Sequence, residues 1–136
     1  TSNASFGVME PKRGLFAGGG TTVRLPRQLA VPAAMEFLLT AERFPVERAV
    51  ELGLVNEVVE ESELLDKAFD WARRINVNAP LAVRATKESV MRGLGLSLEE
   101  AYKVESGLSG KIFRSEDAKE GPKAFAEKRA PRWSGK

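Results

Sequence analysis

The 136-residue chain contains no cysteine and no histidine. Without cysteine it can form no disulfide and has no thiolate nucleophile, and without histidine it has no imidazole base for a catalytic triad. Because these two residue types are also the common zinc ligands, a metal site built on them is excluded, and we expect none. Any acid–base chemistry must therefore come from carboxylates, from lysines or from Tyr102.

Long apolar runs are also missing. No stretch approaches the roughly 18 residues that a membrane-spanning helix needs, and the N-terminus has no basic segment followed by an apolar one. We therefore expect no membrane span and a soluble, cytoplasmic protein. Lys and Arg number 21 against 19 for Asp and Glu, a net charge of +2 that produces no field strong enough to demand a nucleic-acid partner. A chain of this length buries about 70% of its unfolded surface, so one core is expected.

The first part of the chain alternates short apolar segments with turn signals. The apolar stretch Phe6–Met9 predicts a short strand, and Gly14 together with Gly18–Gly20 predicts a loop whose residues need positive φ. From Val31 onward, apolar residues recur at i, i+4, i+7 and i+8. This spacing predicts an amphipathic helix, with Glu36 as a surface charge at the edge of its apolar face.

The middle of the chain predicts a short helix, a short strand and a long helix. Pro45 opens the short helix, and Gly53 stands where a left-handed residue would end it. The segment LVNEVVE, residues 54–60, predicts a strand. The helix that follows from Ser62 is apolar around so much of its circumference that we expect it to be mostly buried.

Three more helices are expected toward the C-terminus. One begins at Pro80, a second follows the S-x-x-E capping box of Ser97 and Glu100, and a third begins at Ser115. Glycines inside the last two predict local features, namely a close packing partner at positions 107 and 110 and a bend or restart at positions 121–122. The pattern as a whole predicts a mainly α fold with short strands.

Five segments of the chain, in order, resemble the enoyl-CoA hydratase/isomerase family, also called the crotonase superfamily. They are FGVMEPKRGLFAGGGTTVRLPR, AMEFLLT, VERAVELGLVNEVV, APLAVRATKESV and EGPKAFAEKRAPRW. Each alone is moderately specific, but five in the right order and spacing make coincidence improbable. The resemblance runs from Phe6 to Trp133 and implies the C-terminal half of a crotonase-type α/β fold, a ββα spiral. Residues 1–60 would form the end of the core, and residues 61–136 a helical region for oligomerisation.

The resemblance implies an active-site role for Glu10. Hydratases of this family use two glutamates that flank the double bond of an enoyl thioester, and two backbone N–H groups that stabilise the enolate-like oxygen. Glu10 matches the glutamate that transfers a proton at the α-carbon. The family places the other glutamate and the oxyanion donors upstream of Phe6, so we expect a fragment that is inactive on its own. Pro11 follows Glu10 directly and is expected to restrict it to extended backbone angles.

Three further positions correspond to substrate-binding positions of the family. Gly14 belongs to the loop beside the acyl pocket, and Phe125 and Lys128 correspond to residues that contact the adenosine end of coenzyme A. The alternative for these last two is a core aromatic residue and a solvated lysine. The run Gly18–Gly20 is interpreted as shaping the loop, since no P-loop Lys-Ser/Thr follows it. The basic residues at positions 129, 132 and 136 are most simply a solvated tail.

Two functions remain open on the sequence. The first is part of an enzyme of fatty acid metabolism, a hydratase or isomerase that acts on acyl-CoA as a trimer or dimer of trimers, with no cofactor besides the coenzyme A of its substrate. The second is a non-catalytic interaction module in which the helical region mediates oligomer contacts and Glu10 is vestigial. The chain alone is expected to be inactive under both.

Overall fold

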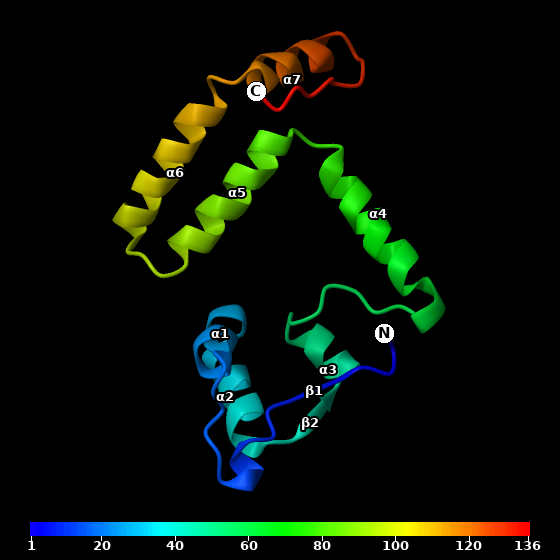
Figure 1. Cartoon of the computed structure of the whole chain (residues 1–136), viewed down its shortest axis with the longest axis vertical. Helices are drawn as coiled ribbons and strands as arrows, with labels where there is room; N and C mark the ends of the chain where they lie inside the picture. The colour runs from blue at the N-terminus through cyan, green and yellow to red at the C-terminus, as the bar shows by residue number, and fades with distance from the viewer. The chain divides into compact units, whose positions relative to one another are not determined.

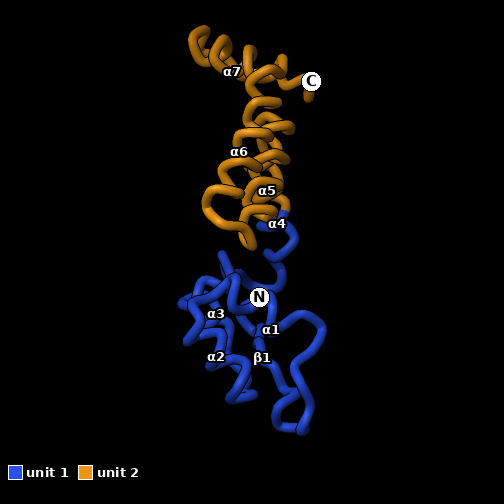
Figure 2. The backbone as a smooth tube through the Cα atoms, turned by 90° about the vertical axis from the view of Figure 1, so that its left-hand side faces the viewer, with its two compact units in different colours: residues 1–68 blue, residues 69–136 orange.

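Helices make up most of the computed structural model, which describes residues 1–136 (Figure 1). The elements follow the order β1, η1, α1, α2, β2, α3, η2, α4, α5, α6 and α7. The chain divides into unit 1, Thr1–Ala68, and unit 2, Phe69–Lys136 (Figure 2). The predicted mainly α fold with short strands is confirmed. None of the helices combines the length and apolarity that a membrane crossing requires.

A two-stranded antiparallel ladder joins the N-terminal segment of unit 1 to a segment nearer its middle. β1 (Ser5–Gly7) pairs with β2 (Arg43–Pro45), so that Phe6 lies opposite Phe44 and Gly7 opposite Arg43. A Cβ atom at Gly7 would lie 2.9 Å from the carbonyl oxygen of Glu42, so only glycine permits this approach. The predicted first strand is present, and it begins one residue earlier than expected. β2 was not predicted, because a strand of three residues is too short to show an alternation of apolar and polar residues.

The core of unit 1 is built on α2 (Val31–Thr40), the helix predicted from its apolar spacing. Phe37 of α2 is only 2% exposed, and its ring centroid lies 3.9 Å from that of Phe44 in β2. α1 (Thr21–Gln28) packs on α2 and buries Leu25. We did not predict α1, because it follows the glycine-rich loop and contains Pro26. The buried cluster consists of Val8, Ala17, Leu25, Leu29, Ala34, Phe37, Leu38 and Phe44.

The predicted short helix is α3 (Val46–Glu51), with Pro45 at its N-cap and Gly53 at φ 75° just after its end. Glu36 of α2 is half-buried and pairs with Arg48 of α3 at 3.2 Å. The strand predicted at residues 54–60 is wrong. Its one backbone hydrogen bond to a distant segment, from the N–H of Ser2 to the oxygen of Val59 at 3.1 Å, makes no ladder.

Unit 2 contains the helical hairpin of α5 (Pro80–Gly93) and α6 (Leu98–Ile112), which lie side by side in Figures 1 and 2. The capping box that opens α6 is formed as predicted. The hydroxyl of Ser97 accepts the Glu100 N–H at 3.3 Å, and the Glu100 carboxylate accepts the Ser97 N–H at 3.0 Å. The close partner predicted at positions 107 and 110 is absent, since a Cβ atom at either glycine would meet nothing within 4 Å.

α7 (Glu116–Ala126) runs without interruption through Gly121 and Pro122, so the predicted bend or restart is wrong. Ser115 caps it as expected, accepting the N–H of Ala118 at 3.1 Å. Gly121 lies under a neighbouring side chain, because a Cβ atom there would be 3.5 Å from the Trp133 ring. The glycine therefore serves close packing of the C-terminal segment and not a break in the helix.

α4 (Leu64–Asn76), which follows the short η2 (Glu61–Glu63), does not show the expected burial. None of its residues is buried, and Phe69 is 57% exposed. The helix itself is present as predicted, and apolar side chains on several of its sides favour contacts with other surfaces. The described chain supplies few of those contacts, because its buried cluster lies entirely in unit 1.

The packing of unit 1 predicts a large effect of truncation at Phe37. We expect Phe37→Ala to lower the free energy of unfolding by about 3–5 kcal/mol, because the cavity would lie between α2 and β2. Phe16→Ala is the matched control, since Phe16 is 79% exposed and its loss should change stability by no more than about 0.5 kcal/mol. Urea titration followed by circular dichroism measures both. Equal effects of the two variants would contradict the packing described.

Candidate functional site

Glu10 lies in a closed turn between β1 and the glycine-rich loop. Buried Val8 anchors the chain on one side of it. The carbonyl oxygen of Glu10 accepts two backbone hydrogen bonds, from the N–H of Arg13 at 2.9 Å and from that of Leu15 at 3.0 Å. The short helix η1 (Pro11–Arg13) fills the turn. The backbone of Glu10 is thereby fixed from both sides.

The backbone conformation of Glu10 differs from the expectation. Pro11 was expected to hold Glu10 extended, but Glu10 has φ −58° and ψ −44°, which is right-handed helical. A proline disfavours this conformation in the preceding residue through contact with its Cδ. The two hydrogen bonds to the Glu10 carbonyl oppose that penalty, and Pro11 itself stands at the first helical position, where its missing N–H is harmless.

Glu10 is partly buried as a residue, and its carboxylate takes part in no hydrogen bond or ion pair with the protein. It differs in this from the neighbouring acidic residue Glu36, which is paired with Arg48. A carboxylate that is positioned but unpaired can accept or donate a proton without first breaking a salt bridge.

The loop after Glu10 follows the predicted pattern of positive φ. Gly14 has φ 68° and ends η1, and its N–H donates to the oxygen of Pro11 at 3.1 Å. Gly19 and Gly20 have φ 67° and 91°, and Gly20 is the N-cap of α1. Between these glycines Phe16 projects into solvent. Unit 1 therefore brings Glu10 and Gly14 into one turn, with an exposed apolar side chain in the segment that follows.

The other two predicted site residues lie in unit 2, at the C-terminal end of α7. The N–H of Lys128 donates to the oxygen of Phe125 at 3.1 Å, and the N–H of Arg129 donates to that of Ala124 at 3.0 Å. These are the two hydrogen bonds of a Schellman motif, with Lys128 at the left-handed position, φ 52°. Phe125 is 88% exposed, so its alternative as a core aromatic residue is wrong.

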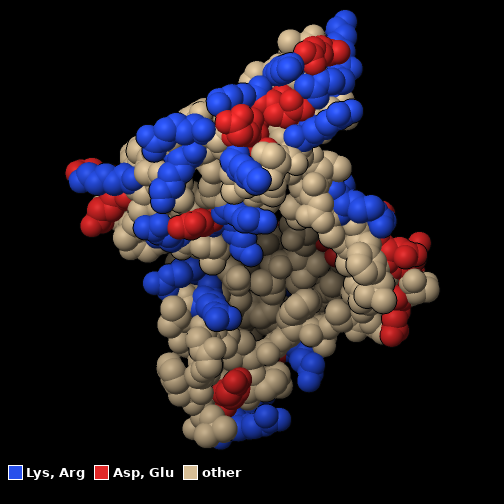
Figure 3. Space-filling model, turned by 45° about the horizontal axis from the view of Figure 1, so that its top comes forward, with Lys and Arg blue, Asp and Glu red and all other residues tan.

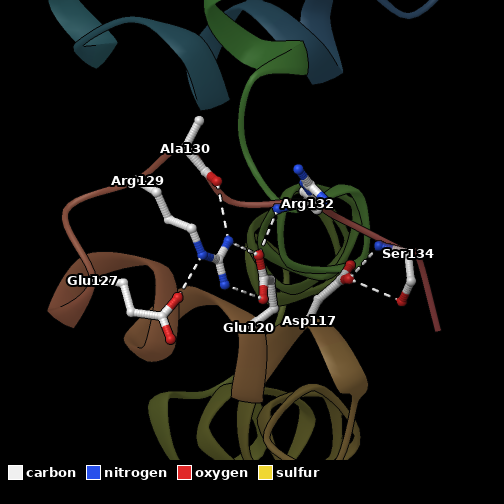
Figure 4. A network of polar contacts seen from close by, with 7 residues as sticks. All are labelled: Asp117, Glu120, Glu127, Arg129, Ala130, Arg132 and Ser134. Atoms are coloured by element: carbon white, nitrogen blue, oxygen red, sulfur yellow. Dashed lines mark hydrogen bonds and ion pairs between the residues drawn. The ribbon is translucent and has the colours of Figure 1, made fainter.

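Of the three basic residues predicted to be solvated, Arg129 is instead paired with carboxylates of α7 and its C-cap, as Figure 4 shows, whereas Arg132 and Lys136 are exposed. The Arg129 guanidinium pairs with both oxygens of Glu120, at 2.6 and 3.0 Å, and with Glu127 at 2.6 Å. Glu120 also accepts the backbone N–H of Arg132 at 2.7 Å. The expectation for Arg129 overlooked the carboxylates two and nine residues earlier, which its side chain can reach because the chain reverses after α7.

Asp117, one helical turn before Glu120, binds the end of the same tail (Figure 4). Asp117 is only 3% exposed, although aspartate is rarely buried in proteins. It accepts hydrogen bonds from the N–H of Ser134 at 2.6 Å, from the Ser134 hydroxyl at 3.1 Å and from the N–H of Gly135 at 3.1 Å. Trp133 between them donates its indole N–H to the oxygen of Val77 at 2.8 Å. We did not single out Asp117 or Glu120, although two carboxylates at i, i+3 before an Arg-rich tail are a usable signal.

The pKa values of Glu120 and Arg129 in this network are strongly shifted. The hydrogen bonds from Arg129, followed by that from the Arg132 backbone, lower the pKa of Glu120 from 4.5 to about 2. The same pairing, first with Glu120 and then with Glu127, raises the pKa of Arg129 above its usual value. Figure 3 shows both acidic and basic side chains on one face of the molecule.

An apolar groove of about 410 Å³ lies between α5 and α6. Its lining includes Val90, Leu108, Ile112 and Phe113, and none of the predicted site residues contributes to it. The groove is therefore a separate feature of the helical hairpin. Like α4, the hairpin therefore exposes apolar side chains.

The fold and these sites define a mainly helical chain with one two-stranded antiparallel sheet. The model of the family described as enoyl-CoA hydratase/isomerase matches residues 1–136. The crystal structure of an enoyl-CoA hydratase from Mycobacterium tuberculosis superposes with a TM-score of 0.92 at 45% identity, over 99% of this chain and 54% of that one. An enoyl-CoA hydratase from Bacillus anthracis gives a TM-score of 0.95 at 36% identity, over 99% and 52%.

Curated relatives agree with this placement. Enoyl-CoA hydratase EchA19 of Mycobacterium tuberculosis is 41% identical over 98% of this chain and 50% of its own length. Carnitinyl-CoA dehydratase of Proteus mirabilis is 41% identical over the whole chain and 54% of its own length. The chain belongs to the enoyl-CoA hydratase/isomerase family. It spans about half the length of the curated relatives that it matches.

The shifted pKa of Glu120 predicts a pH-dependent contribution to stability. Because the pKa is lowered in the folded state, the contribution is present above pH 4.5 and is lost as the pH falls toward about 2. We expect Glu120→Gln to be less stable than the wild type at pH 7, with a gap that narrows progressively below pH 4.5. Denaturant titrations of both proteins at several pH values measure the difference in their free energies of unfolding. In that difference the contributions of the other carboxylates cancel. A gap independent of pH would contradict the pairing.

Proposed function

We propose that this chain supplies the α-carbon acid–base residue and part of the coenzyme A site of an enzyme that adds water to, or removes it from, an acyl-CoA thioester. The observation that carries the proposal is Glu10, whose backbone is held in a closed turn and whose carboxylate is paired with no protein group. Family membership supports the substrate class, since the names of the relatives describe gain or loss of water by an acyl-CoA.

The proposed chemistry assigns one proton to Glu10. In hydration, water adds its oxygen to the β-carbon of the enoyl thioester, and a second base takes the proton that the water loses. The electron pair of the double bond moves toward the thioester oxygen, giving an enolate that backbone donors stabilise. Glu10, in its carboxylic acid form, then gives its proton to the α-carbon. In dehydration the same carboxylate removes the α-proton.

The remaining predicted residues fit roles in binding. Phe125 offers an exposed aromatic face on which an adenine can stack, and Lys128 offers an exposed ammonium group to a phosphate. Gly14 keeps the loop beside Glu10 free of a side chain at a position with φ 68°. Because coenzyme A is part of the substrate, the proposal requires no separate cofactor.

A second role, in assembly, is favoured by the exposed apolar surface of α4. Leu65, Phe69 and Ile75 are exposed on a helix with no buried residue. Surfaces of this kind usually meet another protein surface. We propose that the protein forms a homo-oligomer, a trimer or a dimer of trimers. If Glu10 proved dispensable, this role alone would remain as a non-catalytic function of the chain.

The catalytic proposal predicts the effect of Glu10→Gln. In the natural-length protein that carries this sequence, turnover of a crotonyl-CoA-like substrate should fall by a factor of roughly 10² to 10⁴, as expected for a lost general acid or base. The KM should change little, because the amide keeps the shape of the side chain. A spectrophotometric assay of the enoyl thioester absorbance measures both quantities.

The matched control is Glu47→Gln, the same exchange at an exposed position in α3. It should leave turnover unchanged. Unchanged turnover in Glu10→Gln would refute the assigned role, whereas an equal loss in both variants would point to a general effect on folding.

The assembly proposal predicts a species larger than the monomer mass of 14.9 kDa. Light scattering after size exclusion should show self-association of the chain, and Phe69→Glu should weaken it by placing a charge on the apolar face of α4. Ser62→Glu adds the same charge in η2, ahead of that face, and should have no effect. A monodisperse monomer of the unmodified chain would contradict the proposal.

A further inference from the structure

We propose that the ion pair of Glu120 and Arg129 is a positioning device: it holds Lys128 in its left-handed conformation and so directs the Lys128 ammonium toward the nucleotide end of coenzyme A, beside Phe125 of α7. The inference rests on the proposed function, because it takes the ligand to be a coenzyme A thioester. It adds a role for two residues that do not themselves contact the ligand.

The first step is the backbone of Lys128. Its φ of 52° places it in the left-handed region, and Ala41 is the one other residue besides glycines with positive φ. The left-handed position of a Schellman motif is usually glycine, because a Cβ atom makes this conformation less favourable. Glycine would therefore suit the turn better than lysine. The chain accepts the disfavoured conformation at a position where lysine adds an exposed ammonium group.

The second step is what holds that conformation. Arg129 follows Lys128 directly, and its guanidinium makes the bidentate pair with Glu120 in the preceding turns of α7. Glu120 also accepts the N–H of Arg132, which ties the outgoing chain to the same carboxylate. Bidentate Arg–carboxylate pairs are geometrically specific. With both sides of Lys128 fixed, by α7 before it and by this pair after it, the turn has little freedom to relax.

The third step is what remains available for a ligand. The acidic and basic groups around the turn, Glu120, Glu127 and Arg129, are paired with one another. The Lys128 ammonium makes no hydrogen bond or ion pair within the chain, and Phe125 is exposed three residues before it. An aromatic face and an unpaired cation on one turn suit a nucleobase and its phosphate. The pairing of the other charges keeps Glu120 and Glu127 from neutralising that cation.

The test measures binding by isothermal titration calorimetry with coenzyme A and, separately, with pantetheine, which lacks the nucleotide. The natural-length protein carries Glu120→Gln in one sample. The matched control Glu116→Gln breaks a different ion pair on α7, that with Lys119 at 2.8 Å, which lies away from the turn. We expect Glu120→Gln to weaken coenzyme A binding by about tenfold, the scale of one lost charge-assisted contact. Pantetheine binding and the control should be unchanged.

The variant Lys128→Gly distinguishes an effect on the positioning of the ligand-binding group from an effect on the stability of the protein. It should raise the melting temperature, because glycine fits the left-handed turn, while weakening coenzyme A binding by about tenfold as well. Unchanged coenzyme A affinity in Glu120→Gln, with only a lower melting temperature, would overturn the inference and leave the pair a tail anchor. A lower melting temperature in Lys128→Gly would overturn the conformational argument. If the wild type binds no coenzyme A, the proposed function fails first and this inference with it.

Discussion

The two hydrogen bonds to the Glu10 carbonyl are the constraint on which the catalytic account depends. The N–H groups of Arg13 and Leu15 close a turn that keeps Glu10 in a helical conformation immediately before a proline. Without them the proline would favour extended backbone and would send the carboxylate in another direction. The turn is anchored through Val8 in the core and ends at Gly14, whose left-handed conformation releases the chain toward α1.

Lys128 in unit 2 follows the same principle with different contacts. It also has a backbone conformation that its residue type disfavours, and the two backbone hydrogen bonds of the Schellman motif close the turn next to the ion pair of Glu120 and Arg129. Disfavoured backbone conformations persist where the surroundings over-determine them, and such positions are common at functional sites. In both units the residue of interest keeps an unpaired charged group, while the charges or N–H groups around it are occupied.

The sequence predicted those features that depend on local pattern. The helix from Val31, the Ser97–Glu100 capping box and the left-handed Gly53 follow from apolar spacing or from the chemistry of single residues, and all are present. The features that we missed depend on distant contacts. The expected burial of α4 and the expected strand at residues 54–60 were wrong because each needs a packing or pairing partner that apolar spacing does not supply.

Asp117 and Glu120 show the same limit within the site. Their partners come from a tail up to 18 residues away. The chain reverses at Lys128, and a residue other than glycine at that position gives no sequence signal of a left-handed turn. Family resemblance identified Glu10, Phe125 and Lys128, but the helical backbone of Glu10 contradicts the simple rule for residues before proline. Tertiary hydrogen bonding outweighed that local preference.

The central claim is that the Glu10 carboxylate exchanges a proton with the α-carbon of a bound thioester. The most direct test is proton exchange at that carbon, in D₂O, with a saturated acyl-CoA that cannot undergo dehydration. By NMR, the natural-length protein should replace an α-proton with deuterium, and Glu10→Gln should bind the thioester equally well but lose the exchange. Exchange at the same rate in both proteins would show that another group moves the proton.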